Sequence, residues 1–170
     1  MKPSDVMLVL LAQQGDRDAL NRLLEGVQER LFRYVSRLLS TDAAGAEDVL
    51  QETLLRIARK LPWLSDARLF EAWAYRIASR EVYRAFAASQ PAEPLDDELT
   101  VPEGAPPALT SDELDRMTRS LSPASRAVLV LHYQEDRPLE EIATILDIPL
   151  GTVKSRLAYG LKRLREMVAP

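Results

Sequence analysis

The sequence predicts an all-α protein made of two small helical domains. Apolar residues recur at steps of three and four through most of the chain, and no segment alternates apolar and polar residues over the length of a strand. One stretch rich in proline and acidic residues interrupts this pattern. We therefore expect helical domains over residues 1–89 and 110–170, joined by a flexible acidic linker over residues 90–109.

The first domain is expected to contain four helices. A short helix ends near Gly15, and Asp16 is a suitable N-cap for a long helix that continues to Ser40 with leucine and valine on one side. A third helix is expected over residues 46–61, where a proline ends it, and a fourth over residues 67–88.

The linker carries much of the negative charge of the chain, whose net charge is −4. The acidic residues from position 90 to position 115 are Glu93, Asp96, Asp97, Glu98, Glu103, Asp112, Glu113 and Asp115, and no Lys or Arg lies among them. Without these eight charges the remainder of the chain carries +4. The net charge of the whole chain therefore does not argue against DNA binding.

The second domain begins with two helix-start signals. Thr110 and Glu113 have the spacing of a capping box, and Ser122 followed by Pro123 predicts a cap and a first-turn proline. The helix expected over residues 124–133 leads into the C-terminal segment.

Residues 138–166 have the pattern of a helix-turn-helix. Apolar residues at helical spacing mark two helices, and the string DIPLG interrupts them. Asp147 stands where such a turn often requires a positive φ angle, and Pro149 cannot continue the first helix. Gly151 permits an unusual backbone angle.

The outward face of the second of these helices is basic, with five basic residues and one acid between Gly151 and Pro170. In helix-turn-helix proteins such a face lies in the major groove of DNA. The candidate DNA-binding residues are Thr152, Lys154, Ser155, Arg156, Tyr159, Lys162 and Arg163. A solvated basic face on an ordinary helical hairpin is the alternative, but the turn residues and the one-sided charge favour DNA.

A polar face on the third helix is a second candidate surface. Asp48 and Glu52 lie four positions apart with Gln51 beside them, and like charges at this spacing slightly destabilise a helix. An external cationic partner would relieve this repulsion, and Arg56 can pair with Glu52. From these residues alone, a solvated polar face is the favoured interpretation.

A third candidate surface lies on the fourth helix. Trp73, Arg76, Arg80 and Arg84 form a stripe of one aromatic and three cationic side chains. Guanidinium groups bind phosphates and aromatic rings stack on unpaired bases, so the stripe suits single-stranded nucleic acid. An equally compatible interpretation places Trp73 in the core and the arginines in solvent.

The composition excludes several classes of site. The chain has no Cys, which excludes disulfides, thiolate zinc sites and a cysteine nucleophile, and it has a single His, His132, in an apolar stretch. No nucleophile–base pair, metal cluster or phosphate-binding loop is evident, so we expect no catalysis, cofactor, metal or small-molecule substrate. No apolar run reaches the roughly 18 residues of a membrane span, and no signal-peptide cleavage site is evident, so we expect a cytoplasmic protein without membrane insertion.

Three strings occur together in a characteristic order: AEDVLQETLLRIARKL, FEAWAYRIASR and, after the linker, LSPASRAVLVLHYQEDRPLEEIATILDIPLGTVKSRL. In the order and content of these strings, the chain resembles the bacterial RNA polymerase sigma factors, specifically the two-domain extracytoplasmic-function (ECF) group of the sigma-70 family. The resemblance covers nearly the whole chain outside the linker. It implies a factor that directs core RNA polymerase to promoter DNA, and an anti-sigma factor as the usual control.

The resemblance also implies three residue roles. Asp48, Gln51 and Glu52 match the helix that docks on the clamp coiled coil of core polymerase, which reverses the interpretation of that face as merely solvated. Residues 73–84 match the segment that melts and reads the minus-ten element. Residues 152–163 match the recognition helix for the minus-thirty-five element.

The chain departs from the family pattern at a few positions. Ser79 stands where family members often have Asn, and only Arg80 and Arg84 represent the usual run of arginines that follows. In the recognition helix, Tyr159 and Gly160 stand where Arg and Ala are common.

Two alternatives remain open from the sequence. A stand-alone helix-turn-helix regulator of the response-regulator output type fits the C-terminal part, but it would have no use for the Asp48, Gln51 and Glu52 face. A degenerate sigma-like interaction module fits the small number of arginines after Ile77.

Overall fold

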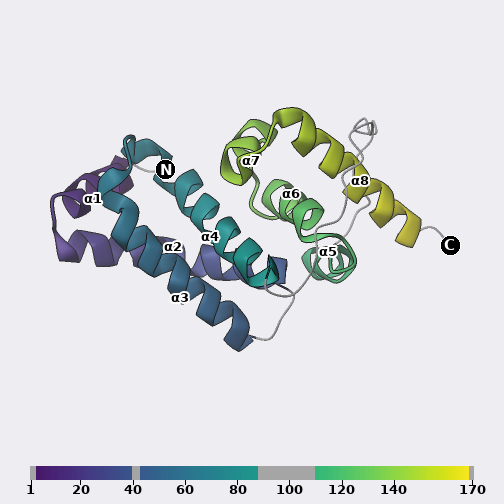
Figure 1. The fold of residues 1–170 in the computed structure, drawn as a ribbon, viewed down its shortest axis with the longest axis horizontal. Helices are drawn as coiled ribbons and strands as arrows, with labels where there is room; N and C mark the ends of the chain where they lie inside the picture. Colours follow the sequence, from purple (N-terminus) through teal and green to yellow (C-terminus); the bar gives the residue numbers. More distant parts are fainter. Residues whose placement is uncertain (1–2, 40–42, 88–109, 169–170) are drawn as a thin grey trace.

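The structure is a computed structural model that describes residues 3–39, 43–87 and 110–168. These residues form α-helices and two 3-10 turns, with no strand among them, which confirms the predicted all-α class (Figure 1). The elements are α1 (Pro3–Gln13), α2 (Arg17–Leu39), α3 (Ala43–Lys60), η1 (Leu61–Trp63), η2 (Ala67–Leu69), α4 (Phe70–Ala87), α5 (Ser111–Thr118), α6 (Pro123–Tyr133), α7 (Leu139–Leu146) and α8 (Leu150–Val168). The expected linker, residues 90–109, lies outside the described residues.

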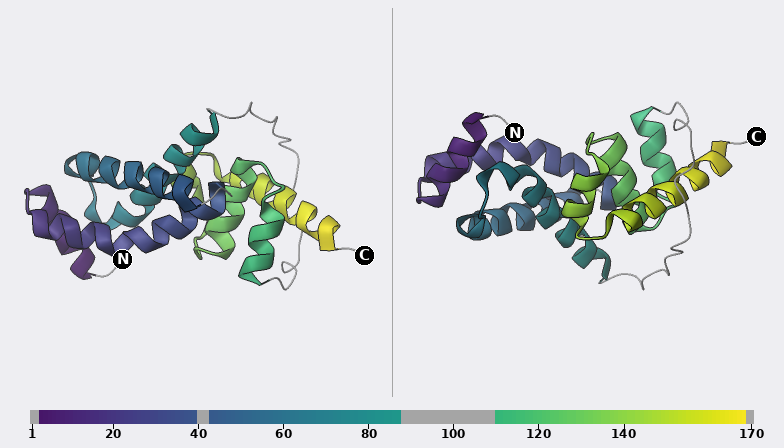
Figure 2. Two further views of the ribbon diagram at one scale, coloured as in Figure 1. Left: turned by 90° about the horizontal axis from the view of Figure 1, so that it is seen from below. Right: turned by 90° about the horizontal axis from the view of Figure 1, so that it is seen from above.

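The first four α-helices pack together at one end of the molecule, and α5–α8 pack at the other (Figures 1 and 2). We call these two groups the N-terminal unit and the C-terminal unit. The long α2 buries the apolar stripe that the sequence predicts, from Leu23 to Leu38, against α1, α3 and α4. Asp16 caps this helix as expected, since its Oδ1 accepts from the N–H of Ala19 at 3.0 Å.

Two helix boundaries in the N-terminal unit differ from expectation. The third helix begins at Ala43 rather than at residue 46, because the two alanines there have high helix propensity. The segment between the third and fourth helices forms two 3-10 turns, so the α-helical part of the fourth helix begins at Phe70. The second of these turns is capped by Asp66, whose side chain accepts from the N–H of Arg68.

The C-terminal unit begins as predicted. Thr110 and Glu113 form a reciprocal capping box at α5, and the hydroxyl of Ser122 accepts from the N–H of Ser125 at the start of α6. In the helix-turn-helix formed by α7 and α8, Asp147 has a φ angle of 58°, which confirms the expected positive φ.

The expectation for Gly151 is wrong. Because Asp147 already provides the left-handed residue and the turn is complete at Pro149, Gly151 lies inside the first turn of α8 and has no positive φ. In α8 it is Gly160 whose lack of a side chain matters to the packing, because α8 crosses α6 there. A Cβ atom at this position would lie 2.7 Å from Cδ1 of Leu129.

The two units are in direct contact. In Figures 1 and 2, α4 runs beside α7 and the end of α2 lies beside α6, and the buried apolar side chains of both units form one continuous cluster. Arg126 of α6 is buried at this junction and donates to the carbonyl oxygen of Leu38, the penultimate residue of α2, at 2.6 Å. The same guanidinium donates to the carbonyl oxygen of Thr118, the last residue of α5, and to that of Leu121 in the connection to α6. One side chain thus satisfies the ends of two helices from different units.

Candidate functional site

The acidic face of α3 is open to solvent. Asp48 and Gln51 are exposed, and Glu52 is half-buried. Nε of Arg56 lies 2.7 Å from Oε1 of Glu52, which confirms that this pair forms, and 3.0 Å from Oε1 of Glu81 on α4. The pair offsets the repulsion between Asp48 and Glu52 only in part, because Asp48 itself is exposed and forms no ion pair with the described residues.

The basic face of α8 is accessible over most of its length. Lys154, Tyr159, Lys162 and Arg163 are exposed, and Arg163 pairs with Glu166 one turn later at 2.9 Å. These side chains alternate with the buried apolar positions of α8, as the helical spacing predicts.

Two of the predicted DNA-binding residues of α8 face the protein instead. Ser155 is 7% exposed, and its hydroxyl donates to the carbonyl oxygen of Thr152 at 3.1 Å. Arg156 is half-buried, and its Nε is buried without a hydrogen-bond partner among the described residues. Burial raises the pKa of Tyr83 on α4, and the nearby positive charge of Arg156 opposes this rise. Arg156 thus lies near enough to Tyr83 of α4 for its charge to affect that group.

The cationic stripe of α4 is largely bound to other parts of the chain. Nε of Arg76 donates to the carbonyl oxygen of Thr144 at 3.0 Å, and Arg80 pairs with Oδ2 of Asp147 at 3.0 Å. Arg84 pairs with Glu81 on its own helix. The remaining member of the stripe, Trp73, is half-buried and packs against the core with its ring centroid 6.2 Å from that of Phe70.

A buried hydrogen-bond chain lies behind this stripe. Ser79 is almost completely buried and donates to the carbonyl oxygen of Tyr75 at 2.8 Å. A hydroxyl has one proton to donate, so the Tyr34 hydroxyl, 2.8 Å from Oγ of Ser79, is the donor of the second bond. Burial raises the pKa of Tyr34 well above its ordinary value. Position 79 thus packs against α2, and a side chain here does not reach the surface of α4.

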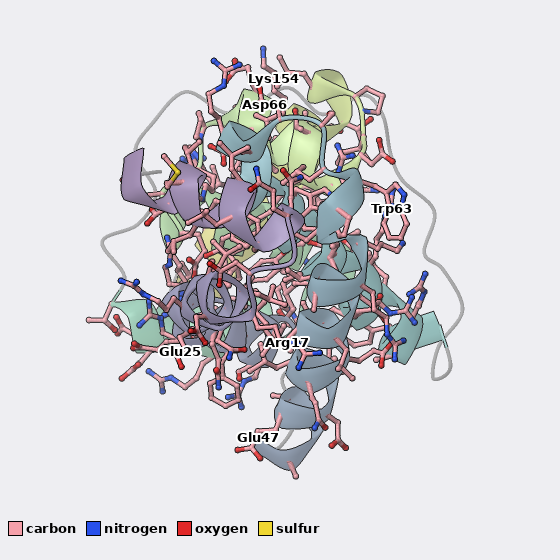
Figure 3. All side chains as sticks on the ribbon, turned by 90° about the vertical axis from the view of Figure 1, so that its left-hand side faces the viewer. Arg17, Glu25, Glu47, Trp63, Asp66 and Lys154 are labelled. Atoms are coloured by element: carbon pink, nitrogen blue, oxygen red, sulfur yellow. The ribbon has the colours of Figure 1, made fainter. Side chains whose placement is uncertain are left out.

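Sequence reasoning missed the most exposed aromatic side chain of the described chain, Trp63. It lies on η1, is 79% exposed and points away from the protein (Figure 3). The amide of Gln13 on α1 supports this turn by donating to the carbonyl oxygens of Leu61 and Leu64 at 3.0 and 2.8 Å. The signal in the sequence was a Trp directly after Pro62, which ends a helix and places the next residue in a loop.

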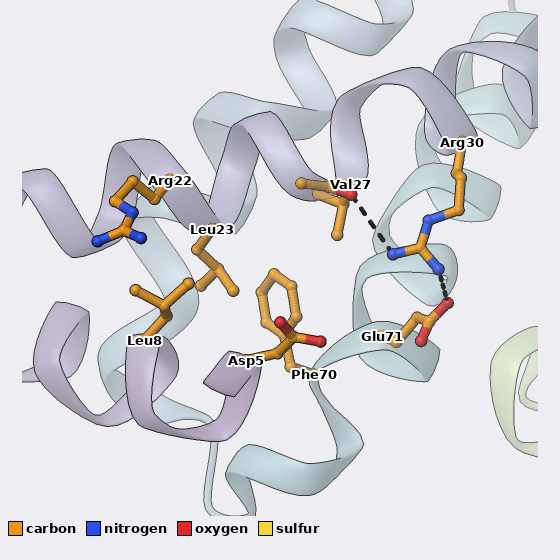
Figure 4. Close-up of a pocket in the computed structure, with 9 residues that line it drawn as sticks. Asp5, Leu8, Arg22, Leu23, Val27, Arg30, Phe70 and Glu71 are labelled. Atoms are coloured by element: carbon orange, nitrogen blue, oxygen red, sulfur yellow. Dashed lines mark hydrogen bonds and ion pairs between the residues drawn. The ribbon is translucent and has the colours of Figure 1, made fainter. Parts of the chain in front are cut away.

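The sequence also did not show that Glu71 joins the two units. This carboxylate, in the first turn of α4, pairs with Arg30 of α2 and with Arg137, which lies between α6 and α7. Figure 4 shows Arg30 and Glu71 facing each other beside a cavity of about 60 Å³ between α1, α2 and α4. The guanidinium of Arg137 also lies 5.0 Å from the centre of the Tyr75 ring.

A second carboxylate, Glu135, has the same role. Its Oε2 accepts from the hydroxyl of Tyr75 at 2.6 Å, and its Oε1 pairs with Arg37 of α2 at 3.2 Å. Burial and the bond to Glu135 together raise the pKa of Tyr75. Arg37 also lies 3.6 Å from Asp115 of α5, so α2, α4, α5 and the end of α6 meet around one group of charges.

The described part of the chain holds no group of His, Cys, Asp and Glu side chains arranged to bind a metal ion. None of its helices is long and apolar enough to cross a membrane.

Comparison with known proteins decides the family. Residues 23–91 match the family model of sigma-70 region 2, and residues 119–166 match that of sigma-70 region 4. The ECF RNA polymerase sigma factor SigL of Mycobacterium tuberculosis is 38% identical over 143 residues, which cover 79% of this chain and 80% of SigL. The chain belongs to the ECF RNA polymerase sigma factors. It is therefore a factor that directs RNA polymerase to promoters.

Solved structures agree with the fold of this sigma factor. The structure of CnrH in complex with the cytosolic domain of CnrY has a TM-score of 0.72, 19% identity and coverage of 97% of each chain. The sigma factor RpoE of Bartonella quintana, solved with the anti-sigma factor NepR, has a TM-score of 0.64 and 24% identity, and covers 87% of this chain and 95% of its own.

The family assignment also bears on the stand-alone regulator, one of the two alternatives left open by the sequence. The match to region 2 includes the acidic face of α3 and the whole of α4, which a stand-alone helix-turn-helix regulator does not need. The promoter-directing function is favoured over this alternative.

Proposed function

We propose that this sigma factor works through three surfaces: the acidic face of α3 binds core polymerase, the region of α4 and η1 binds the minus-ten element, and α8 binds the minus-thirty-five element. One observation carries this proposal: a single chain presents an accessible acidic ridge in the region-2 match and an accessible basic ridge in the region-4 match. Two modest DNA contacts that are tethered to one polymerase reinforce each other by effective concentration.

The polymerase-binding surface consists of Asp48, Gln51 and Glu52. The variant Asp48→Lys is expected to abolish co-purification with core polymerase, because it reverses a charge on the ridge. Glu25→Lys is the matched control. Glu25 is an exposed acid on α2, so this substitution makes the same change of charge away from the α3 face (Figure 3). Equal retention of both variants by core polymerase would refute the docking assignment.

The proposed minus-thirty-five surface consists of Thr152, Lys154, Arg156, Tyr159, Lys162 and Arg163, without the buried Ser155. A base-reading arginine contributes about 1–3 kcal/mol of discrimination, so Arg156→Ala in the holoenzyme should weaken promoter binding and relax the preference at one base pair. Lys162 is exposed and suited to bind a DNA phosphate. Lys162→Ala should therefore weaken binding about equally on all DNA sequences. Identical effects of the two variants would remove Arg156 from the base-reading set.

The minus-ten surface consists of Trp73, Arg76, Arg80 and Arg84, to which we add Trp63. Half-burial of Trp73 against Phe70 leaves little of its ring for stacking, whereas the ring of Trp63 is free. Stacking of an unpaired base on an aromatic ring contributes roughly 1–3 kcal/mol. Trp63→Ala should therefore slow promoter opening while leaving binding to closed duplex DNA unchanged, as read by permanganate footprinting of unpaired thymines.

The factor is proposed to act in the cytoplasm, without catalysing a bond change and without a cofactor. An anti-sigma factor is its proposed regulator, supported by the relative RpoE, whose structure was solved with such a partner. The deciding experiment is run-off transcription with purified core polymerase on genomic promoter fragments. Specific transcripts that require the chain are expected, and their absence with active core polymerase would contradict the proposal.

A further inference from the structure

Trp63 stands on a short turn that holds its ring away from the protein. It is the last residue of η1, and its side chain is 79% exposed, so the position of the ring depends on the backbone of the turn more than on packing (Figure 3). The N–H of Leu64 closes this turn by donating to the carbonyl oxygen of Leu61 at 3.0 Å. Hydrogen-bond geometry in 3-10 turns is poorer than in α-helices, so this bond alone restrains the turn weakly.

Gln13 of α1 supports the turn from outside. Its Nε2 donates to the carbonyl oxygen of Leu61 at 3.0 Å and to that of Leu64 at 2.8 Å. A side-chain amide nitrogen carries two protons, so each bond takes its own proton and both are used on one turn. The two carbonyl groups lie on either side of Trp63 in the sequence. Two bonds from a separate helix therefore fix the backbone that carries the ring.

The local structure of α1 places Gln13 at this contact. Gln13 is the last residue of α1 and lies four positions after Val9, which is completely buried, so both residues lie on the face of α1 that packs against the protein. An apolar residue would continue this face, whereas Gln adds two donors to it. The helix stops before Gly15, whose φ angle of 94° suits glycine, and Asp16 then caps α2. These signals fix the end of α1 and the position of Gln13 beside η1.

We propose that Gln13 is a positioning residue of the minus-ten surface, whose two hydrogen bonds hold η1 so that the ring of Trp63 meets an unpaired base in one orientation. The inference rests on the proposed function, because Gln13 acts through Trp63. A base that stacks on a ring already held in place loses less binding energy to ordering than one that stacks on a moving ring. A change at position 13 therefore affects promoter opening, and it leaves binding to closed duplex DNA unchanged.

The test uses two substitutions at position 13 with opposite hydrogen-bonding capacity. Gln13→Met keeps the length of the side chain and removes both donors, whereas Gln13→Lys keeps donors in an ammonium group. Gln14 is adjacent and exposed, so Gln14→Met and Gln14→Lys are matched controls for the changes of polarity and charge. Each variant is assembled with core polymerase, and permanganate footprinting follows the rate at which promoter thymines become unpaired.

Gln13→Met is expected to slow promoter opening, by no more than Trp63→Ala does. Loss of a stacked base weakens binding roughly 5- to 150-fold, which sets the upper bound for both variants. Gln13→Lys and the two Gln14 variants should open promoters at close to the native rate. In the Trp63→Ala background, Gln13→Met should have no further effect, whereas a purely structural role would add its own loss in both backgrounds.

Fluorescence measures the restraint on the ring directly in the free chain. The chain has two Trp, so Trp73→Phe leaves Trp63 as the single emitter, and time-resolved anisotropy reports the rotation of its ring on the nanosecond scale. Gln13→Met should increase the fast component of this rotation, and Gln13→Lys should restore the native value. Circular dichroism shows whether the helices are kept. If Gln13→Met loses helix content, Gln13→Asn, which keeps the amide and shortens its reach, takes its place in every measurement.

Three results would overturn the inference: a native opening rate in Gln13→Met, an equal slowing by Gln13→Met with and without Trp63, or an unchanged rotation of the ring in Gln13→Met. A native opening rate in Trp63→Ala would contradict the proposed function of Trp63 instead. The anisotropy of Trp63 would then still decide whether Gln13 restrains the turn.

Discussion

Gly160 and Gly26 allow the same substitution, Gly→Ala, to be made inside two different helices with opposite expected results. At Gly160, the added Cβ would lie 2.7 Å from Cδ1 and 3.2 Å from Cγ of Leu129, whereas at Gly26 it would meet nothing within 4 Å. Leu129 is completely buried, so its side chain cannot move into solvent to make room.

The magnitudes follow from two separate effects. Alanine is favoured over glycine in a helix interior by about 0.8–1 kcal/mol, and this gain applies at both positions. Overpacking a buried contact costs about 1–3 kcal/mol, and this cost applies at Gly160 alone. Gly26→Ala is therefore expected to raise the free energy of unfolding by up to about 1 kcal/mol, and Gly160→Ala to leave it unchanged or lower it by up to about 2 kcal/mol. The difference between the variants isolates the packing cost.

Urea unfolding followed by circular dichroism measures both variants. A second background, Leu129→Ala, provides the control, because truncating the leucine removes the atoms that the new methyl group would meet. In that background Gly160→Ala should stabilise the protein about as much as Gly26→Ala does. If Gly160→Ala is equally stabilising in the native background, the close approach of α8 to α6 is not as described.

Three further predictions concern buried and capping groups. Ser79→Ala should lower the free energy of unfolding by about 1–3 kcal/mol, because it leaves the buried hydroxyl of Tyr34 without its acceptor. The double variant Tyr34→Phe with Ser79→Ala, which also lacks that hydroxyl, should recover part of the loss in urea unfolding. The pKa values of Tyr34 and Tyr75 are raised above the ordinary value of 10.0, so their stabilising contribution is complete below pH 10.0 and is lost as the pH rises toward their folded-state values. The free energy of unfolding should therefore fall as the pH rises above 10.0, and it should fall less steeply in Tyr75→Phe. An equal slope in the variant and the native chain would contradict a raised pKa of Tyr75. The backbone N–H and the hydroxyl of Thr110 lower the pKa of Glu113 below its ordinary value of 4.5, so the capping box stabilises the helix at neutral pH and weakens as the pH falls through that lowered value. Removal of the hydroxyl in Thr110→Ala should raise the pKa of Glu113, which carboxyl chemical shifts in an NMR titration will show.

Local signals in the sequence were sufficient for most of the fold. The capping box at Thr110, the cap at Ser122 and the positive φ of Asp147 each depend on residues within one turn of the chain, and the structure confirms all three. Gly151 was misjudged because a glycine near a turn is compatible both with the turn and with the first turn of the next helix. Only the position of the turn residue decides between them.

The candidate site was less accessible to sequence reasoning because its polar groups meet across long separations. Helical spacing places Arg156 on the outward side of α8, but it contains no information about which other parts of the chain partly bury that side chain. Glu71 and Arg137 are separated by 66 positions, and nothing near either residue marks the other as its partner. Trp73 and Trp63 show the same limit, since the pattern identified the aromatic residue within a helix and overlooked the one in a turn.

The arginines of α4 show why one sequence pattern predicts two different contacts. A guanidinium group binds any well-placed electronegative oxygen, so a stripe that suits phosphates also suits the end of α7. The two units belong to one chain, so the effective concentration of α7 near α4 is high, and contacts too weak to hold two separate proteins are sufficient to close this one. DNA must therefore compete with this internal partner for Arg76 and Arg80.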